Sequence, residues 1–250
     1  MSATPRTVRI VLPAYNEAGN LPALLRALQD TMTGNGLAYE IVVVDDASTD
    51  DTAAVARESA VGQPFVLLRH DVNQGLGGTL RDGLNLALER SAAHDVIVTM
   101  DADDTHPPGT ILRMVRMIDE GYDVVIASRY RSGSRVYGVS LLRRFMSRAA
   151  SVLMRVLFPT RGVRDFTCGY RAYRVAVLRQ AIDRYGSEFL NQDGFQCMVD
   201  ILLKLRSLDL IFVEVPLLLR YDRKSGTSKM NVSRTAWQTL TLLARRRFGS

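Results

Sequence analysis

The sequence predicts an α/β protein with a mostly parallel β-sheet that is covered by helices on both faces. Short runs of β-branched residues recur along the chain and alternate with longer stretches in which leucines have helical spacing. Several of the runs are apolar at consecutive positions, which predicts strands buried on both faces, as in parallel sheets. The chain has 250 residues, of which 47% are hydrophobic, so it is long enough to bury a substantial core.

Six runs predict the strands of the sheet. The second contains four successive apolar residues, Ile41–Val44, and the fourth is strongly apolar from Val96 to Met100. In an open parallel sheet of this kind, functional residues are expected just beyond the carboxyl ends of the strands. The expected strands are Arg9–Pro13, Glu40–Val44, Phe65–Leu68, Asp95–Met100, Asp123–Ala127 and Ile211–Val215.

Helices are expected between the first four strands. Leu21, Leu24, Leu25 and Leu28 have the spacing of one helical face, and 50–60 and 76–92 predict two further helices. Polar, glycine-containing stretches at 133–134 and 221–230 predict loops. No linker divides the chain, so we expect one domain over 1–230, followed by a basic amphipathic helix over 231–250.

Composition excludes several classes of protein. Two cysteines are too few for a disulfide scaffold or a Cys-rich zinc site, and they fit a reducing compartment. The first nine residues lack the apolar segment of a secretory signal, and no apolar run approaches the roughly 20 residues that span a bilayer. These features predict a cytoplasmic protein.

Charge is divided unequally along the chain. Residues 1–110 hold seven arginines, no lysine and fifteen acidic residues, which gives a net charge of −8. Residues 111–250 hold 25 basic and 11 acidic residues, which gives +14. An acidic half is suited to a divalent cation, and a basic half to phosphates, nucleic acid or an anionic membrane.

Carboxylates follow three of the predicted strands. Glu17 comes after the first, Asp45 and Asp46 after the second, and Asp101 and Asp103 after the fourth. Clustered carboxylates repel one another unless a cation compensates, and an all-oxygen set suits Mg²⁺ or Mn²⁺. The alternative role for such residues is helix capping, which we favour for the neighbouring pair Ser48 and Asp50.

Five spaced motifs together resemble the family 2 glycosyltransferases, which have the GT-A fold, and among them most closely the polyprenyl (dolichol) phosphate mannose synthase group. The resemblance extends from about residue 8 to about residue 230, nearly the whole chain. It implies a nucleotide-sugar and metal half over 1–110 and an acceptor half over 111–230. The motifs are Val11–Glu17, Val43–Asp50, Asn73–Gly77, Met100–Asp103 and Ser128–Tyr130.

The resemblance also implies a donor site with a bound Mg²⁺ or Mn²⁺. Asp101 and Asp103 match the Asp-x-Asp motif that contacts the ribose and the metal-bridged diphosphate. Thr105 stands where many members carry a glutamine that ligates the metal, so Asp101, Asp103 and Thr105 are the expected metal ligands. The alternatives are that Thr105 acts through a water or that Asp104 takes its place. The residues expected to bind the nucleotide-sugar are Pro13, Ala14, Tyr15, Glu17, Asp46, Asp101, Ala102, Asp103, Arg223 and Lys229.

Arg129 matches the arginine of the family's Ser-Arg-Tyr segment, which implies a place near the donor or acceptor phosphates. A guanidinium that follows a buried strand suits bidentate phosphate binding, although an ion pair with an aspartate is the alternative. Cys168 is expected to be a small packed residue, and Gln196 replaces a lysine of the family. The expected acceptor-phosphate residues are Arg129, Arg144, Ser147, Arg223 and Ser228, and the expected catalytic residues are Asp101, Asp103 and Arg129.

Two basic amphipathic helices point to a membrane surface. Between Arg129 and Arg179 there are twelve arginines and one acidic residue. There, Leu142, Met146, Ala149, Leu153 and Val156 share one helical face, nearly opposite Arg144, Arg148, Ser151 and Arg155. In the C-terminal segment, Trp237, Leu240 and Ala244 share a face. The alternative is that both apolar faces pack on the domain core.

The expected function is the transfer of a hexose from a nucleotide diphosphate-sugar to a polyprenyl phosphate, with inversion at the anomeric carbon. Mannose, from GDP-mannose, is the favoured sugar, and glucose is the alternative. Attachment to the membrane would be peripheral or through a membrane-protein partner, and no nucleic acid is expected as a ligand. Two alternatives stay open. One is transfer to a saccharide or glycerolipid hydroxyl, with Asp104 or Asp193 as the base, and the other is a non-catalytic nucleotide-sugar-binding module.

Overall fold

The computed structural model describes residues 6–223, 235, 237–239, 241–243 and 246, with the side chains of 141–143 excepted. A seven-stranded sheet has the order β3-β2-β1-β4-β7-β5-β8, and a separate parallel pair joins β6 to β9. The strands are β1 (Thr7–Ala14), β2 (Ala38–Asp45), β3 (Phe65–Arg69), β4 (Val96–Thr99), β5 (Val124–Ser128), β6 (Arg135–Tyr137), β7 (Arg171–Arg174), β8 (Phe212–Pro216) and β9 (Leu218–Arg220).

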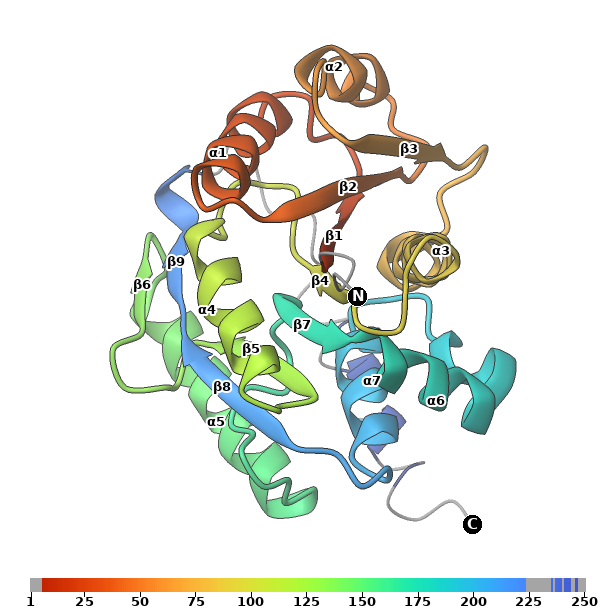
Figure 1. Cartoon of the computed structure of the whole chain (residues 1–250). Helices are drawn as coiled ribbons and strands as arrows, with labels where there is room; N and C mark the ends of the chain where they lie inside the picture. The colour runs from red at the N-terminus through yellow and green to blue at the C-terminus, as the bar shows by residue number, and fades with distance from the viewer. Residues whose placement is uncertain (1–5, 224–234, 236, 240, 244–245, 247–250) are drawn as a thin grey trace.

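Helices lie on both sides of the large sheet, α1 and α4 on one side and α3 and α6 on the other (Figure 1). Two short 3-10 helices, Gly186–Leu190 and Tyr221–Arg223, complete the described elements. The helices are α1 (Leu21–Gly34), α2 (Thr52–Ser59), α3 (Gly75–Glu89), α4 (Gly109–Asp119), α5 (Leu141–Leu157), α6 (Val175–Tyr185) and α7 (Cys197–Leu205).

All six predicted strands and the mostly parallel sheet are confirmed, but the sequence did not reveal β7. This strand lies antiparallel between β4 and β5. Its residues are Arg-Ala-Tyr-Arg, which lack the continuous apolar pattern of the other central strands. Arg171 is nevertheless fully buried, because its guanidinium donates at 2.8 Å to the backbone carbonyls of Phe166 and Met198. A buried arginine whose Nη atoms donate to backbone carbonyls outside its own strand leaves no apolar strand signal in the local sequence.

The three expected helices among the first four strands are confirmed, whereas α4, α6 and α7 were not predicted. The apolar residues of α4, among them Ile111, Met114, Val115 and Ile118, do have helical spacing and are buried. Helix α7 is buried along its whole length, so it lacks a polar face that would mark a period.

Helix α3 packs against β1 and β2 through a glycine. A Cβ atom added at Gly83 would lie 2.6 Å from Val11 Cγ1 and 2.9 Å from Val44 Cγ2. Only the hydrogen of glycine therefore lets the helix approach the sheet at this point. The first turn of the same helix lines the candidate site, so this packing also fixes one side of that site.

We expect Gly83→Ala to destabilise the fold by about 1–3 kcal/mol, because the added methyl group overlaps two buried valines. Urea unfolding followed by circular dichroism measures the change. Gly34→Ala is the matched control, since a Cβ at that helical glycine meets nothing within 4 Å, and its free energy of unfolding should change by less than about 1 kcal/mol. Equal stabilities of the two variants would contradict the described packing of α3.

Candidate active site

Three turns at the carboxyl ends of β1, β2 and β4 contain the non-glycine residues with a left-handed backbone. Asn16, Ala47 and Asp104 have φ angles of 54°, 57° and 56°. These are the only such residues among those described, and one of them lies in each turn that carries the predicted carboxylates. Left-handed conformations of this kind concentrate at functional sites, where surrounding contacts hold them. Serine and asparagine side chains tie the first two turns together, since Ser48 Oγ accepts from Asn16 N at 2.9 Å.

A cavity of about 640 Å³ opens among these turns. Eight of the predicted donor-binding residues line it: Pro13, Ala14, Tyr15, Glu17, Asp46, Asp101, Ala102 and Asp103. Sequence reasoning gave no site role to Thr79, Tyr221, Thr235 and Gln238, which also line it. The remaining lining residues are Asn73, Gln74, Gly75, Leu76, Asp193, Gly194, Phe195 and Gln196. Several of these belong to the motifs that carried the resemblance.

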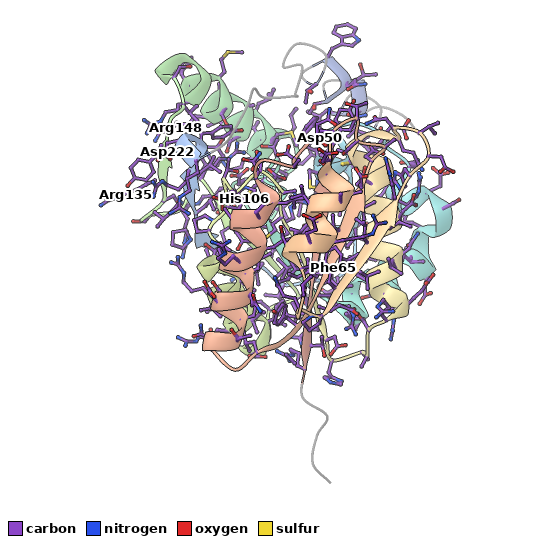
Figure 2. The ribbon with its side chains drawn as sticks, turned by 90° about the horizontal axis from the view of Figure 1, so that it is seen from above. Asp50, Phe65, His106, Arg135, Arg148 and Asp222 are labelled. Carbon is purple, nitrogen blue, oxygen red and sulfur yellow. The ribbon has the colours of Figure 1, made fainter. Side chains whose placement is uncertain are left out.

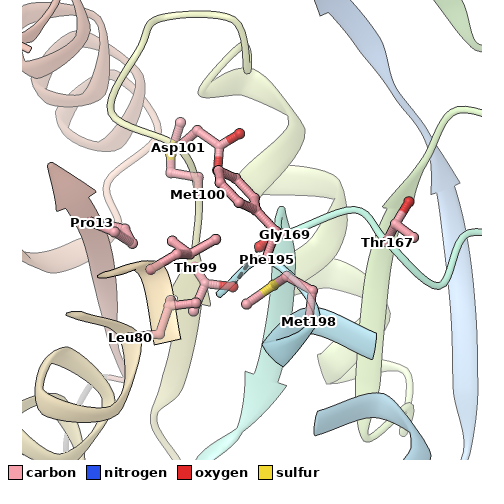
Figure 3. A pocket seen from close by; sticks show the side chains of 10 residues that line it. Pro13, Leu80, Thr99, Met100, Asp101, Thr167, Gly169, Phe195 and Met198 are labelled. Atoms are coloured by element: carbon pink, nitrogen blue, oxygen red, sulfur yellow. Dashed lines mark hydrogen bonds between the residues drawn. The ribbon is translucent and has the colours of Figure 1, made fainter. Parts of the chain in front are cut away.

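A smaller cavity of about 60 Å³ lies beside Asp101 (Figure 3). Phe195, Met198 and Leu80 give it apolar walls. Gly169 borders it on the side of β7, and a Cβ added there would lie 3.3 Å from Met198 Sδ and 3.6 Å from Asp101 Oδ1. The glycine therefore keeps the space next to the Asp101 carboxylate open.

The two aspartates of the Asp-x-Asp motif differ in their surroundings. The side chain of Asp101 is 51% exposed, whereas Asp103 is buried. Thr105 fixes Asp103, because its hydroxyl and its backbone N–H both donate to Asp103 Oδ1, at 2.6 Å and 3.2 Å. The direct ligation of a metal by Thr105 stays a prediction. The structure shows instead that this buried hydroxyl orients the carboxylate of Asp103.

His106 supports the same turn, and sequence reasoning missed it. The ring is buried, stacks on Tyr170 with 4.9 Å between the centroids, and accepts the backbone N–H of Asp101 at Nδ1 over 3.3 Å. The hydroxyl of Tyr170 donates to Pro107 O at 3.0 Å. Only its position three residues after Asp103 could have drawn attention to this histidine.

The oxygen groups of the site fit a divalent cation. Asp101 and Asp103 both line the large cavity, and hard cations such as Mg²⁺ and Mn²⁺ bind through one or two carboxylates together with substrate phosphates. Across the described part of the chain, no group of three or more His, Cys, Asp or Glu side chains stands close enough to hold a metal by itself. The site therefore fits a cation that the donor diphosphate helps to coordinate.

Asp46 is buried and already engaged by the protein. Its Oδ1 accepts from Gln74 N at 2.8 Å, and its Oδ2 from Gly75 N at 2.9 Å. His70 Nδ1 lies 2.7 Å from the same Oδ1. Direct contact between Asp46 and a nucleotide stays a prediction, and the structure adds that this carboxylate holds the start of α3.

Arg129 forms the structural ion pair that sequence reasoning held as the alternative to phosphate binding. Its Nε and Nη2 donate to the two oxygens of Asp165 at 2.8 Å and 2.7 Å, and Nη2 also donates to Thr167 Oγ1 at 2.5 Å. Burial alone would raise the pKa of Asp165, but the charge and hydrogen bonds of Arg129 outweigh it and hold that pKa below its ordinary value. Thr167 lines the small cavity, so the pair lies next to the site. A role of Arg129 toward a phosphate stays a prediction.

The other predicted acceptor residues are spread over several elements. The backbone carbonyl of Ser147 accepts the hydroxyl of Tyr130 at 2.8 Å, and Arg144 is exposed on α5. Arg223 is exposed at the end of the 3-10 helix, whereas Ser228 and Lys229 lie outside the described residues. Burial raises the pKa of Asp104, against the opposing charge of Arg223. Burial also raises the pKa of the Cys168 thiol to about 12, which agrees with a packed residue rather than a nucleophile.

Helix α5 turns its apolar face away from the protein. Phe145 and Val156 are each 72% exposed, and Met146, Val152 and Leu153 are exposed as well. Leu142, which was expected on this face, lies outside the described side chains. The alternative that this face packs on the domain core is therefore wrong for the described residues of α5.

The side of α5 that meets the protein is partly polar. Ser151 was expected on the solvated face with three arginines, but it is buried and donates to Arg164 O at 2.7 Å. Met154 and the following Phe158 are buried on the same side. Arg148 and Arg155 are exposed, and Figure 2 shows Arg148 toward one edge of the molecule.

The C-terminal segment reaches the large cavity, which was not expected. Its described residues are helical, and Thr235 and Gln238 line the cavity while Trp237 is exposed. Leu240 and Ala244, expected to share a face with Trp237, lie outside the described residues. Arg246 Nη2 lies 2.8 Å from Asp200 Oδ1, which attaches the segment to α7. A separate helix over 231–250 stays a prediction, but this part of the chain contributes to the site.

Both the sequence and the fold of this chain have counterparts among known proteins. Residues 9–181 match the sequence profile described as Glycosyl transferase family 2. The chain belongs to glycosyl transferase family 2. It is thus a glycosyltransferase enzyme, as the motifs implied.

Named relatives cover most of this glycosyltransferase. It is 33% identical to polyprenol monophosphomannose synthase of Mycolicibacterium smegmatis, over 92% of this chain and 83% of the relative. It is 35% identical to undecaprenyl-phosphate mannosyltransferase of Micrococcus luteus, over 90% of this chain and 87% of the relative. The resemblance to the polyprenyl phosphate mannose synthase group is confirmed.

A solved structure with the same fold is glucosyl-3-phosphoglycerate synthase of Mycobacterium tuberculosis, in complex with Mn²⁺, uridine diphosphate and phosphoglyceric acid. It superposes with a TM-score of 0.68 at 20% identity and covers 97% of this chain and 79% of its own. This likeness confirms the GT-A-type fold of the glycosyltransferase.

We expect Arg129→Met to destabilise the glycosyltransferase by about 3 kcal/mol at pH 7, because it leaves the buried Asp165 without its partner. Since the pKa of Asp165 is depressed in the folded state, the ion pair stabilises the wild type above the unfolded value of about 4 and is lost as the pH falls through the folded value. The deficit of the variant should shrink below about pH 4.

Chemical denaturation between pH 3 and pH 8 measures this difference. Arg131→Met removes an exposed arginine close in sequence and should leave the free energy of unfolding unchanged within about 0.5 kcal/mol. A deficit of Arg129→Met that stays constant down to pH 3 would contradict the assignment of the pair to Asp165.

Proposed function

We propose that this glycosyltransferase moves one hexose, mannose in preference to glucose, from a nucleotide diphosphate-sugar to a polyprenyl phosphate. The observation that carries the proposal is the large cavity at the carboxyl ends of β1, β2 and β4, with Asp101 and Asp103 in its wall. The names of the relatives support mannose as the sugar and a polyprenyl phosphate as the acceptor. GDP-mannose is the favoured donor.

The walls of the cavity suit the parts of such a donor. The Pro13–Glu17 turn and Asp46 border the space that is expected to take the base and ribose. Asp101 and Asp103 border the space that is expected to take the diphosphate. The small apolar-walled cavity beside Asp101, with Phe195 and Met198, adjoins the diphosphate end. A sugar attached to that diphosphate would extend from the large cavity toward these apolar side chains.

A cation held by Asp103 and Asp101 would supply positive charge against the departing nucleoside diphosphate. Thr105 keeps Asp103 in one orientation, and His106 supports the backbone of Asp101, so both carboxylates are positioned before the donor arrives. The Mn²⁺ and Mg²⁺ complexes of glucosyl-3-phosphoglycerate synthase support these two metals as candidates.

The acceptor in this proposal is itself the nucleophile. A phosphate monoester is ionised near neutral pH, so its oxygen attacks the anomeric carbon without a strong general base, and the sugar-diphosphate bond breaks on the opposite face with inversion. Arg129 lies next to the small cavity through Thr167, where a fixed positive charge would attract the acceptor phosphate. In-line positioning of the two substrates supplies most of the rate enhancement.

Replacement of Asp103 by Ala should lower transfer of labelled mannose from GDP-mannose to polyprenyl phosphate, with Mn²⁺ present, by about a hundredfold or more. Thr105→Val should lower it by about tenfold, because Asp103 loses its oriented partner, whereas Thr105→Ser should keep most of the activity. The readout is sugar in a lipid product that mild acid cleaves.

Asp183→Ala, which removes an exposed aspartate on α6, is the control and should retain wild-type activity. If the wild type forms no acid-labile lipid product with any nucleotide-sugar, the proposed acceptor is wrong. A product on a hydroxyl acceptor, abolished by Asp193→Asn with donor binding intact, would support the other transferase reaction instead.

We also propose that α5 lies on a membrane surface that holds the lipid acceptor. Among the described residues, no helix has the length and apolar character needed to cross a bilayer. The exposed apolar side chains of α5, flanked by the exposed Arg144, Arg148 and Arg155, suit an anionic lipid surface. The cytoplasmic face of a membrane, with its anionic lipids, is the expected location.

The double variant Phe145→Ser and Val156→Ser should bind vesicles of phosphatidylglycerol and phosphatidylcholine about tenfold more weakly than the wild type, because two of the most exposed apolar side chains of the face are removed. Co-sedimentation measures the partition. Val61→Ser and Val72→Ser together are the matched control, since both valines are exposed but lie outside α5. An equal loss in both double variants would contradict the assignment of the lipid surface to α5.

A further inference from the structure

His70 lies between two carboxylates just beyond the end of β3. Its ring is buried, with Nδ1 at 2.7 Å from Asp46 Oδ1 and Nε2 at 3.1 Å from Asp82 Oδ2. The first contact is a hydrogen bond, whereas the second is an ion-pair contact that is not aligned as one. Asp46 belongs to the turn after β2 and Asp82 to the middle of α3, so the histidine connects two elements that border the large cavity.

The contacts around His70 close into a ring at the start of α3. Arg81 Nε donates to Asp82 Oδ1 at 3.0 Å, and its Nη2 donates to Gln74 Oε1 at 2.8 Å. The backbone N–H of Gln74 in turn donates to Asp46 Oδ1 at 2.8 Å. The ring therefore fixes both the backbone and the side chain of Gln74, a residue of the cavity wall.

The fixed start of α3 also holds the loop that precedes α7, on the opposite side of the wall. The backbone N–H of Gly77 donates to Asp193 O at 2.7 Å. A Cβ atom added at Gly77 would lie 1.5 Å from Gln192 O, so the helix and this loop touch backbone to backbone. Asp193 and Gly194 line the cavity, and a shift of the first turn of α3 would therefore displace them too.

We propose that His70 is a positioning residue for donor binding. With Asp82 it holds the Asp46 carboxylate and the first turn of α3, and through them the wall formed by Gln74, Gly75 and Asp193. Both ring nitrogens face carboxylate oxygens, at 2.7 Å and 3.1 Å. The inference rests on the proposed function, because it assigns the wall to a nucleotide-sugar donor.

The position of His70 outside both cavities predicts which step its replacement impairs. His70 lies outside the set of residues that line either cavity, so its loss should weaken donor binding rather than the chemical step. His70→Ala removes the ring between Asp46 and Asp82, so that Asp46 keeps the backbone N–H groups of the α3 start and Asp82 keeps Arg81. His70→Asn keeps an N–H within reach of Asp46. Asp82→Asn is a milder change at a partly exposed side chain.

Titration calorimetry of GDP and of UDP, each with saturating Mn²⁺, tests the proposal on the full chain. We expect the Kd of His70→Ala to rise about tenfold, that of Asp82→Asn about threefold, and His70→Asn to recover part of the loss. In the transfer assay, the KM for the donor should rise while kcat stays within about twofold. His94→Ala, at a half-exposed histidine, is the control and should match the wild type.

Each result of the calorimetry and the transfer assay either supports or overturns the proposed role of His70. A His70→Ala protein that melts at lower temperature but keeps the wild-type Kd and KM would reduce the histidine to a purely structural role and overturn the proposal. Should His70→Ala fail to fold, an unchanged Kd for Asp82→Asn would overturn it equally. Wild-type protein that binds neither nucleotide would instead refute the proposed function itself, a result visible before any variant is compared.

Discussion

Electrostatic repulsion among the carboxylates at one edge of a parallel sheet is the constraint on which this site depends. Parallel strands deliver Asp45, Asp46, Asp101 and Asp103 to the same edge, and the fold compensates most of them individually. Arg69 pairs with Asp45, and Asp46 meets His70 and two backbone N–H groups. Asp103 accepts from Thr105. Asp101, which is half exposed, and Asp103 both line the cavity, where an added cation would complete this compensation.

Buried carboxylates are also compensated in the basic half of the chain, residues 111–250. Asp165 and Glu214 are buried side by side in sequence-distant elements, and each accepts backbone N–H groups, including Asp165 N at 2.6 Å from Glu214 Oε1. Burial raises the pKa of Glu214, whereas Arg129 keeps Asp165 charged. A rigid arginine is thereby held at the border of the small cavity. Its orientation is set by the protein before any phosphate arrives.

The exposed apolar face of α5 bears on how the two proposed substrates would reach the enzyme. A helix that buries Ser151 and exposes phenylalanine, methionine and valine side chains has the kind of apolar surface that marks an interaction site. Arg144 and Arg148 on the same helix favour an anionic surface as that cover. A transferase whose acceptor is a lipid would then take its donor from water and its acceptor from the membrane.

The sequence by itself determined the parallel sheet, since consecutive apolar residues such as Ile41–Val44 require burial on both faces. It also singled out, as a predicted donor site, eight residues that line one cavity in the structure. Local patterns act over a few residues, so they carry no information about partners that are distant in the chain. The antiparallel insertion of β7, the Arg129–Asp165 pair, the ring around His70 and the arrival of Thr235 at the cavity were therefore decided by tertiary structure. The orientation of α5 belongs with them, because amphipathic spacing defines an apolar face but not what that face meets.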